Sequence, residues 1–177
     1  MRHMAAPFAF ATRMMAILIT TLAATAAAPP DPIVIIVNKT AAVDSLSTKQ
    51  LKEIFFGGKT RWPNGQPIQT LSTSPDTQEH AAAIQFLFGM TEAEYEKYVL
   101  QANFTGKGAE VPRDAGSAQA VVNLVGLIPG AISFARVSLV NGRVKVIRID
   151  GLAPGDKGYP LGGVKTAVGA KTEPGGK

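Results

Sequence analysis

The segment from Ser47 to Gly65, STKQLKEIFFGGKTRWPNG, constrains the local fold more tightly than any other part of this 177-residue chain. Ser47 can accept a hydrogen bond from the backbone three residues on while the Gln50 side chain reaches back, which is the pattern of a capping box. Apolar residues then recur at helical spacing, and Gly57 supplies the left-handed conformation that ends many helices. The pattern predicts a helix of about two to three turns. A tight turn at Pro63-Asn64-Gly65 follows it.

Strand and helix signals alternate through the rest of the chain. The expected strands cover residues 33–37, 67–72, 131–135 and 143–149, and the other expected helices begin at Asp76, Thr91 and Ala115. Residues 137–140 either pair with the last strand through an Asn141-Gly142 hairpin turn or form a short helix, and the Asn-Gly pair favours the hairpin. The mixture predicts an α/β fold in which helices flank a central mixed sheet. No internal repeat or linker divides the chain.

The first 28 residues have the composition of a secretory signal peptide. They carry Arg2 and Arg13, no acidic residue, an apolar run over residues 14–22 and small residues over 23–28. The run is shorter than the roughly 20 residues that span a bilayer, so an uncleaved membrane anchor is the weaker alternative. We therefore expect residues 1–28 to be removed, residues 29–161 to form one α/β domain, and the Gly- and Lys-rich residues 162–177 to be a disordered tail. The cysteine-free chain is expected in the periplasm or secreted, without stable membrane insertion.

Residues that carry chemistry are sparse. Beyond residue 28 the chain has one histidine, His80, and no cysteine, which excludes His-Cys metal sites and cysteine nucleophiles. No G-x-S-x-G elbow occurs, so the sequence predicts no catalytic residue, no metal and no cofactor. A ligand contact at a helix mouth is one interpretation of His80, but an isolated imidazole favours a solvated or capping surface residue. No basic helix with interleaved aromatics supports nucleic-acid binding.

The strongest binding candidate is the hydroxyl-rich loop from Ser72 to Gln78, which leads into a predicted helix. Free backbone N–H groups and the positive end of the helix dipole suit an oxyanion at such a place. Asp76 is interpreted first as a helix cap and second as a ligand contact. Arg136 follows a predicted strand, where residues of open α/β sheets often face a cleft. The candidate ligand-binding residues are Ser72, Thr73, Ser74, Asp76, Thr77, Gln78 and Arg136.

Several motifs, taken in order, resemble those of phosphate-type ABC transporter substrate-binding proteins. They are the strand ending in Val37-Asn38-Lys39, the IFFGGK and WPNG elements, FTGK at Phe104–Lys107, IPGAISFA at Ile128–Ala135, and the run from Ile149-Asp150-Gly151 to Gly158–Leu161. The resemblance covers roughly residues 33–161. It implies a type II periplasmic binding protein-like fold, reduced to about one lobe of the two that close over a ligand in that family.

The resemblance also implies a function. In the family, an arginine followed by a Ser-Gly-Thr segment holds phosphate; here Thr77 stands at the threonine position and Ser72 near the arginine position, while the arginine and the Ser-Gly pair are absent. We expect a non-enzymatic, periplasmic solute-binding protein that takes an oxyanion such as phosphate for ABC-type transport or sensing, with an ABC permease or envelope protein as partner. The alternative is an accessory or protein-interaction scaffold whose pocket has lapsed.

Overall fold

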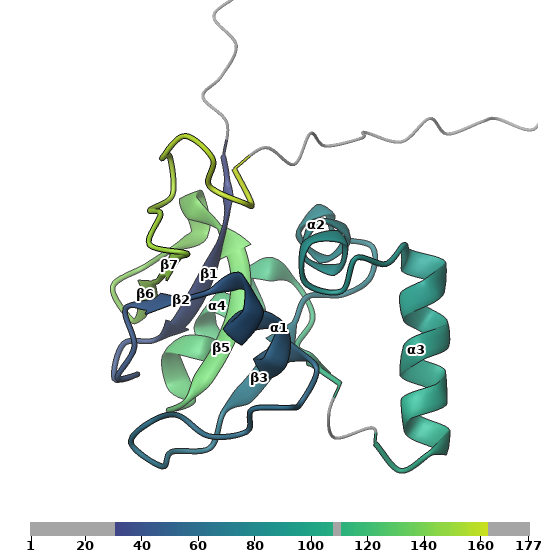
Figure 1. The fold of residues 1–177 in the computed structure, drawn as a ribbon. Coiled ribbons are helices and arrows are strands. Elements are labelled where there is room, and N and C mark those ends of the chain that lie inside the picture. The colour runs from purple at the N-terminus through teal and green to yellow at the C-terminus, as the bar shows by residue number, and fades with distance from the viewer. Residues whose placement is uncertain (1–30, 108–110, 163–177) are drawn as a thin grey trace, which may run out of the picture.

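The computed structural model describes residues 31–107 and 111–162, which form a central sheet covered by helices (Figure 1). The main sheet has the strand order β4-β3-β5-β1-β6. Its strands are β1 (Ile33–Asn38), β3 (Gln69–Ser72), β4 (Arg113–Asp114), β5 (Ala131–Arg136) and β6 (Val144–Val146). β1 runs antiparallel to β5 and β6, whereas β3 runs parallel to β4 and β5. The sheet is therefore mixed, as predicted.

The hydrophobic core is built around β1 and β5. All six residues of β1 are buried, which explains its continuous apolar run, because a strand covered on both faces needs no polar alternation. β5 pairs with it residue by residue, with Ile35 opposite Phe134. The strands predicted at 33–37 and 131–135 are confirmed.

Four α-helices in the described residues surround this core. They are α1 (Thr48–Phe55), α2 (Gln78–Leu87), α3 (Glu92–Phe104) and α4 (Ala118–Leu127). Figure 1 shows α4 behind the sheet, where it packs on β1 and β5, and α1 in front of it. α2 packs on β5 and α1, while α3 packs chiefly against α2 and stands away from the sheet. Within the described residues no helix is long and apolar enough to cross a membrane.

The helix starts predicted at Ser47 and Thr91 are confirmed, each with its capping box. Ser47 accepts from the Gln50 amide, and the Gln50 side chain accepts from the Ser47 amide at 2.9 Å. The same reciprocal bonds join Thr91 and Glu94 at the start of α3. Gly57 has a φ of 75° and follows the end of α1, as expected.

Two predictions of local structure are wrong. The N-cap of α2 is Thr77, not Asp76: the Thr77 hydroxyl accepts from the His80 amide at 3.2 Å, while Asp76 is exposed in the preceding turn. The predicted hairpin is absent, since residues 137–139 form a short 3-10 helix and β6 pairs with β1. β1 lies between β5 and β6 in the sheet, so residues 137–140 form the connection from β5 to β6 across β1.

Other boundaries differ by a few residues. α4 begins after its cap Ser117 rather than at Ala115. The predicted strand 143–149 is interrupted at Ile147, so that β6 joins the main sheet and β7 (Arg148–Ile149) pairs in parallel with β2 (Ser45–Leu46). The expected signal peptide, residues 1–28, and all but the first residue of the expected tail, 162–177, lie outside the described residues.

Candidate functional site

The predicted binding loop connects the end of β3 to the first turn of α2. Thr73 is fully buried, and its hydroxyl lies 2.7 Å from the Thr77 hydroxyl, which in turn donates to the Ser74 carbonyl at 2.9 Å. The Ser74 amide donates to the Gly116 carbonyl, which ties the loop to the segment after β4. The loop is thus held rigidly by its own hydroxyl groups. The amides of Gln78 and Glu79, in the first turn of α2, have no acceptor within the helix.

Arg136 lies beside the same helix start. Its Nε donates to Glu79 Oε1 at 2.6 Å, and its Nη2 donates to the Gln78 side chain. Glu79 is only 7% exposed, so this ion pair is largely shielded from water. The structure therefore brings Arg136, Thr77 and Gln78 together around the first turn of α2, where Arg136 is paired with Glu79.

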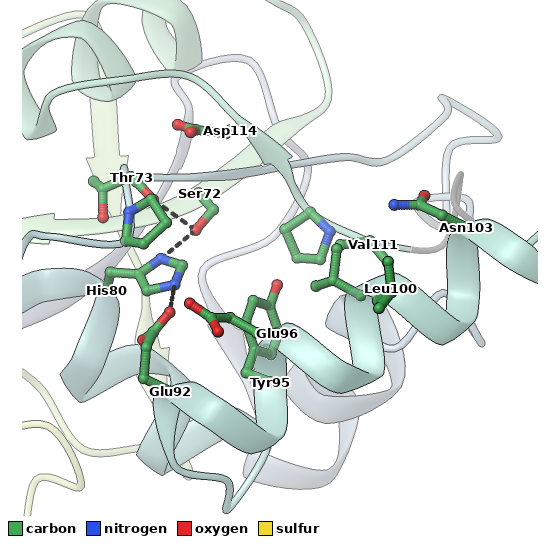
Figure 2. A pocket seen from close by; sticks show the side chains of 13 residues that line it. Ser72, Thr73, His80, Glu92, Tyr95, Glu96, Leu100, Asn103, Val111 and Asp114 are labelled. Atoms are coloured by element: carbon green, nitrogen blue, oxygen red, sulfur yellow. Dashed lines mark hydrogen bonds and ion pairs between the residues drawn. The ribbon is translucent and has the colours of Figure 1, made fainter.

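Ser72 and Thr73 face a cavity of about 290 Å³ between α3, the first turn of α2 and the β3–β4 edge (Figure 2). Ser74 lies at its margin, where its hydroxyl donates to Asp114 Oδ1 at 3.4 Å. The residues that line the cavity are Ser72, Thr73, Pro75, His80, Glu92, Tyr95, Glu96, Val99, Leu100, Asn103, Val111, Pro112 and Asp114.

The His80 side chain lines this cavity, so the interpretation of His80 as a solvated surface residue is wrong. It is 4% exposed, its Nδ1 lies 3.0 Å from Ser72 Oγ, and its Nε2 lies 3.3 Å from Glu92 Oε1. Its ring also contacts the Tyr95 ring edge-on. The prediction failed because the first turn of α2 faces α3, an arrangement that depends on how the two helices pack.

Ser72, His80 and Glu92 have the residue types of a hydrolase triad, but the two ring nitrogens are exchanged. His80 Nδ1 lies 3.0 Å from Ser72 Oγ and Nε2 lies 3.3 Å from Glu92 Oε1, whereas in a Ser-His-Asp triad Nε2 faces the serine and Nδ1 faces the carboxylate. The Ser72 hydroxyl also has the Thr73 carbonyl within hydrogen-bond distance, at 3.2 Å.

Negative charge dominates the cavity. Glu92, Glu96 and Asp114 contribute carboxylates, and no Lys or Arg is among the described residues that line it. Burial raises the pKa of the Tyr95 phenol, with smaller contributions from Tyr98 and Glu92, so the ring stays neutral. The charge of this lining therefore disfavours an anion inside the cavity.

The carboxylates and Tyr95 were not predicted as site residues. Glu92, Tyr95 and Glu96 recur at a spacing of three and four, which places them on one face of α3, and this spacing was the available signal. Asp114 offered no such signal, because its position depends on the parallel pairing of β4 with β3.

The described residues form a helix-covered mixed sheet in which the candidate loop joins β3 to α2. No protein-family model matches the chain. Among solved structures it is similar to a protein from Clostridium perfringens, assigned as a phosphate ABC transporter substrate-binding protein with bound phosphate. The TM-score is 0.55 and the identity 23%, over 70% of this chain and 46% of that chain.

Two further structures give the same result. An ABC-type phosphate transport receptor from Vibrio cholerae matches with a TM-score of 0.57 and 19% identity, over 70% of this chain and 48% of that chain. PstS from Borrelia burgdorferi matches with a TM-score of 0.50 and 12% identity, over 70% of this chain and 49% of that chain. The chain spans about half the length of the structures that it matches. The resemblance to phosphate-type substrate-binding proteins is thus confirmed at the level of the fold.

Proposed function

We propose that this chain is a non-enzymatic solute-binding lobe that takes a small oxyanion such as phosphate at the start of α2. The observation that supports this most directly is that the Ser72–Gln78 loop occupies a loop-to-helix junction in a fold shared with a phosphate-bound protein. The open amides of the first turn, the Thr77 hydroxyl and the Arg136 guanidinium all lie at this junction. Amides at a helix start and a nearby guanidinium are the groups that bind oxyanions in proteins.

The wider role that we propose is that of an exported protein, periplasmic or secreted, which delivers its solute to an ABC permease or reports on it to an envelope partner. The signal-like residues 1–28 support export. If the exported protein, sequenced from its N-terminus, still begins at Met1, the proposal of a cleaved signal peptide is wrong.

Oxyanion binding is tested by thermal unfolding in phosphate, sulfate and molybdate, with chloride at matched ionic strength as control. A ligand present at a hundredfold excess over its dissociation constant adds about 2.7 kcal/mol to the free energy of unfolding. We expect a selective rise of the midpoint by roughly 5 to 10 °C for the bound oxyanion. No shift at millimolar concentrations of any of the three would contradict oxyanion binding.

A pair of matched variants locates the site. Thr77→Ala and Thr91→Ala each remove a threonine N-cap, from α2 and α3 respectively, and each should lower stability by about 1 kcal/mol. Only Thr77→Ala should also weaken oxyanion binding. If Thr77→Ala and Ser74→Ala both bind the oxyanion as tightly as the control Thr91→Ala, this loop is not part of the binding site.

A second function, an interaction scaffold with a lapsed pocket, is favoured by one specific feature. Ser72 stands near the position where the family has a phosphate-binding arginine, and the cation nearby, Arg136, is already paired with Glu79. Charge-assisted hydrogen bonds are roughly twice as strong as neutral ones, so this replacement weakens an anion site. Absence of any oxyanion effect, combined with co-purification of an envelope protein, would favour the scaffold.

A further inference from the structure

The outer face of α3 carries two exposed apolar side chains one helical turn apart. Phe104 is 84% exposed and Leu100 is 58% exposed. They are four residues apart, so they belong to one stripe of the helix. α3 packs chiefly against α2 and stands away from the sheet, which leaves this stripe uncovered in the described part of the chain (Figure 1). Adjacent exposed phenylalanine and leucine side chains favour an interaction surface over an ordinary solvent face.

The same stripe borders the cavity between α3, α2 and the β3–β4 edge. Leu100 and Asn103 line this cavity, together with the apolar side chains of Val99, Val111 and Pro112 (Figure 2). Its volume of about 290 Å³ exceeds the roughly 150 Å³ of an apolar protein cavity that binds benzene, so a phenylalanine ring fits. One lobe therefore carries a protruding aromatic side chain and, one turn away on the same helix, a recess that can hold such a side chain.

The carboxylates of the cavity are compatible with an aromatic ring. Glu92 is paired with His80, and Asp114 accepts hydrogen bonds from the Gly116 amide at 2.8 Å and from the Ser74 hydroxyl. Glu96 is exposed at the rim of the cavity and keeps its contact with water. The edge of an aromatic ring carries partial positive charge, so a ring edge beside these oxygens is favourable.

We propose that two copies of this chain associate through α3, with Phe104 of each copy seated in the cavity of the other. A two-fold axis near Leu100 makes the helices antiparallel and joins the same patch of both copies. At 1.5 Å per residue, Phe104 lies about 6 Å from the axis on one side and Glu96, at the cavity, about 6 Å on the other, so each ring faces the opposite cavity. The two Glu96 carboxylates are then about 12 Å apart, beyond the Debye length of about 8 Å at physiological salt.

The interface is small. Burial of one phenylalanine removes about 150 to 250 Å² from water. The two Phe104 rings, the two Leu100 side chains and the walls that they cover together reach roughly 1,000 Å², the lower limit for a specific interface. We therefore expect a weak dimer, with a dissociation constant on the order of 10 to 100 µM. This inference does not rest on oxyanion binding at the start of α2.

Sedimentation velocity of the exported protein over about 5 to 500 µM measures the association. We expect a reversible monomer–dimer equilibrium that Phe104→Ala weakens at least about tenfold, since a central aromatic side chain dominates such an interface. The control Leu127→Ala removes another exposed apolar side chain, 65% exposed at the end of α4, and should leave the equilibrium unchanged. A monomer at every concentration, or equal dimerisation of wild type and Phe104→Ala, would overturn the proposal.

A single cysteine tests the position of the two-fold axis, because the chain has no cysteine of its own. At an interaxial distance of about 10 Å, facing Cα atoms of two packed helices lie roughly 5 Å apart, a separation that a disulfide spans. In a glutathione redox buffer, Leu100→Cys should therefore form a disulfide-linked dimer at least about tenfold faster than the equally accessible control Leu127→Cys. Equal rates for the two variants would place the contact elsewhere and overturn the α3 pairing.

Discussion

Replacing Gly130 by alanine tests the close contact between Gly130, just before β5, and Pro67, just before β3. β3 leads into the binding loop. Gly130 precedes β5 with a φ of 84°, and a Cβ atom there would lie 2.2 Å from the Pro67 carbonyl oxygen. Its own carbonyl accepts from the indole of Trp62 at 2.9 Å and from the Gln69 amide at 3.2 Å. A methyl group at Gly130 must therefore push the start of β3 away from β5 and break these two hydrogen bonds or strain them.

The magnitude follows from a matched glycine. Gly65 has nearly the same φ, 82°, but an added Cβ atom there meets nothing within 4 Å. Alanine at Gly65 carries only the cost of the left-handed conformation, about 1 to 2 kcal/mol, partly offset by the lower entropy of the unfolded chain. Alanine at Gly130 carries this cost plus about 1 to 3 kcal/mol for overpacking against the backbone.

Urea unfolding followed by tryptophan fluorescence measures both variants. Trp62 is the single tryptophan of the chain and is 2% exposed, so its emission reports the region directly. With a urea slope of about 1 to 3 kcal/mol per molar, we expect the midpoint of Gly130→Ala to lie roughly 1 M below that of Gly65→Ala. Equal midpoints for the two variants would refute the steric argument.

Three further variants test single hydrogen bonds and buried groups. Hydrogen bonds from the Thr48 hydroxyl and amide lower the pKa of Asp150, so its stabilising effect is present above the ordinary pKa of 3.8 and is lost as the pH falls through the lowered value. In Asp150→Asn the free energy of unfolding should therefore fall less steeply as the pH is lowered than it does in wild type. An equally steep fall in the variant would contradict this. Burial raises the pKa of Tyr159 from 10.0 to about 12, so its contribution is complete below pH 10.0 and is lost as the pH rises to about 12. Tyr159→Phe should reduce this alkaline loss in urea titrations, whereas a loss equal to that of wild type would assign it to other groups. The fully buried Ser133 donates to a backbone carbonyl of β3 at 2.8 Å, so Ser133→Ala should cost about 1 to 2 kcal/mol in urea unfolding. The control Ser138→Ala removes an exposed hydroxyl and should cost much less; equal costs would contradict the role of burial.

The elements that could be predicted from sequence are those whose signals are local. Ser47 with Gln50, and Thr91 with Glu94, satisfy helix amides within a single turn, so the caps follow from residue spacing alone. The continuous apolar run of β1 likewise indicates burial on both faces before any partner is known. The candidate loop was placed correctly at the junction of β3 and α2 for the same reason.

Tertiary structure decided which residues meet. The burial of His80 depends on the packing of α3 on α2, and the separation of β6 from β7 depends on which neighbouring strands have free edges. The carboxylate-lined cavity joins residues from β3, α2, α3 and β4, and only its α3 residues, such as Glu92, Tyr95 and Glu96, recur at a spacing that indicates a shared face. Hydrogen bonds within a turn need only local sequence, whereas a site assembled from four elements depends on the balance of packing over the whole core.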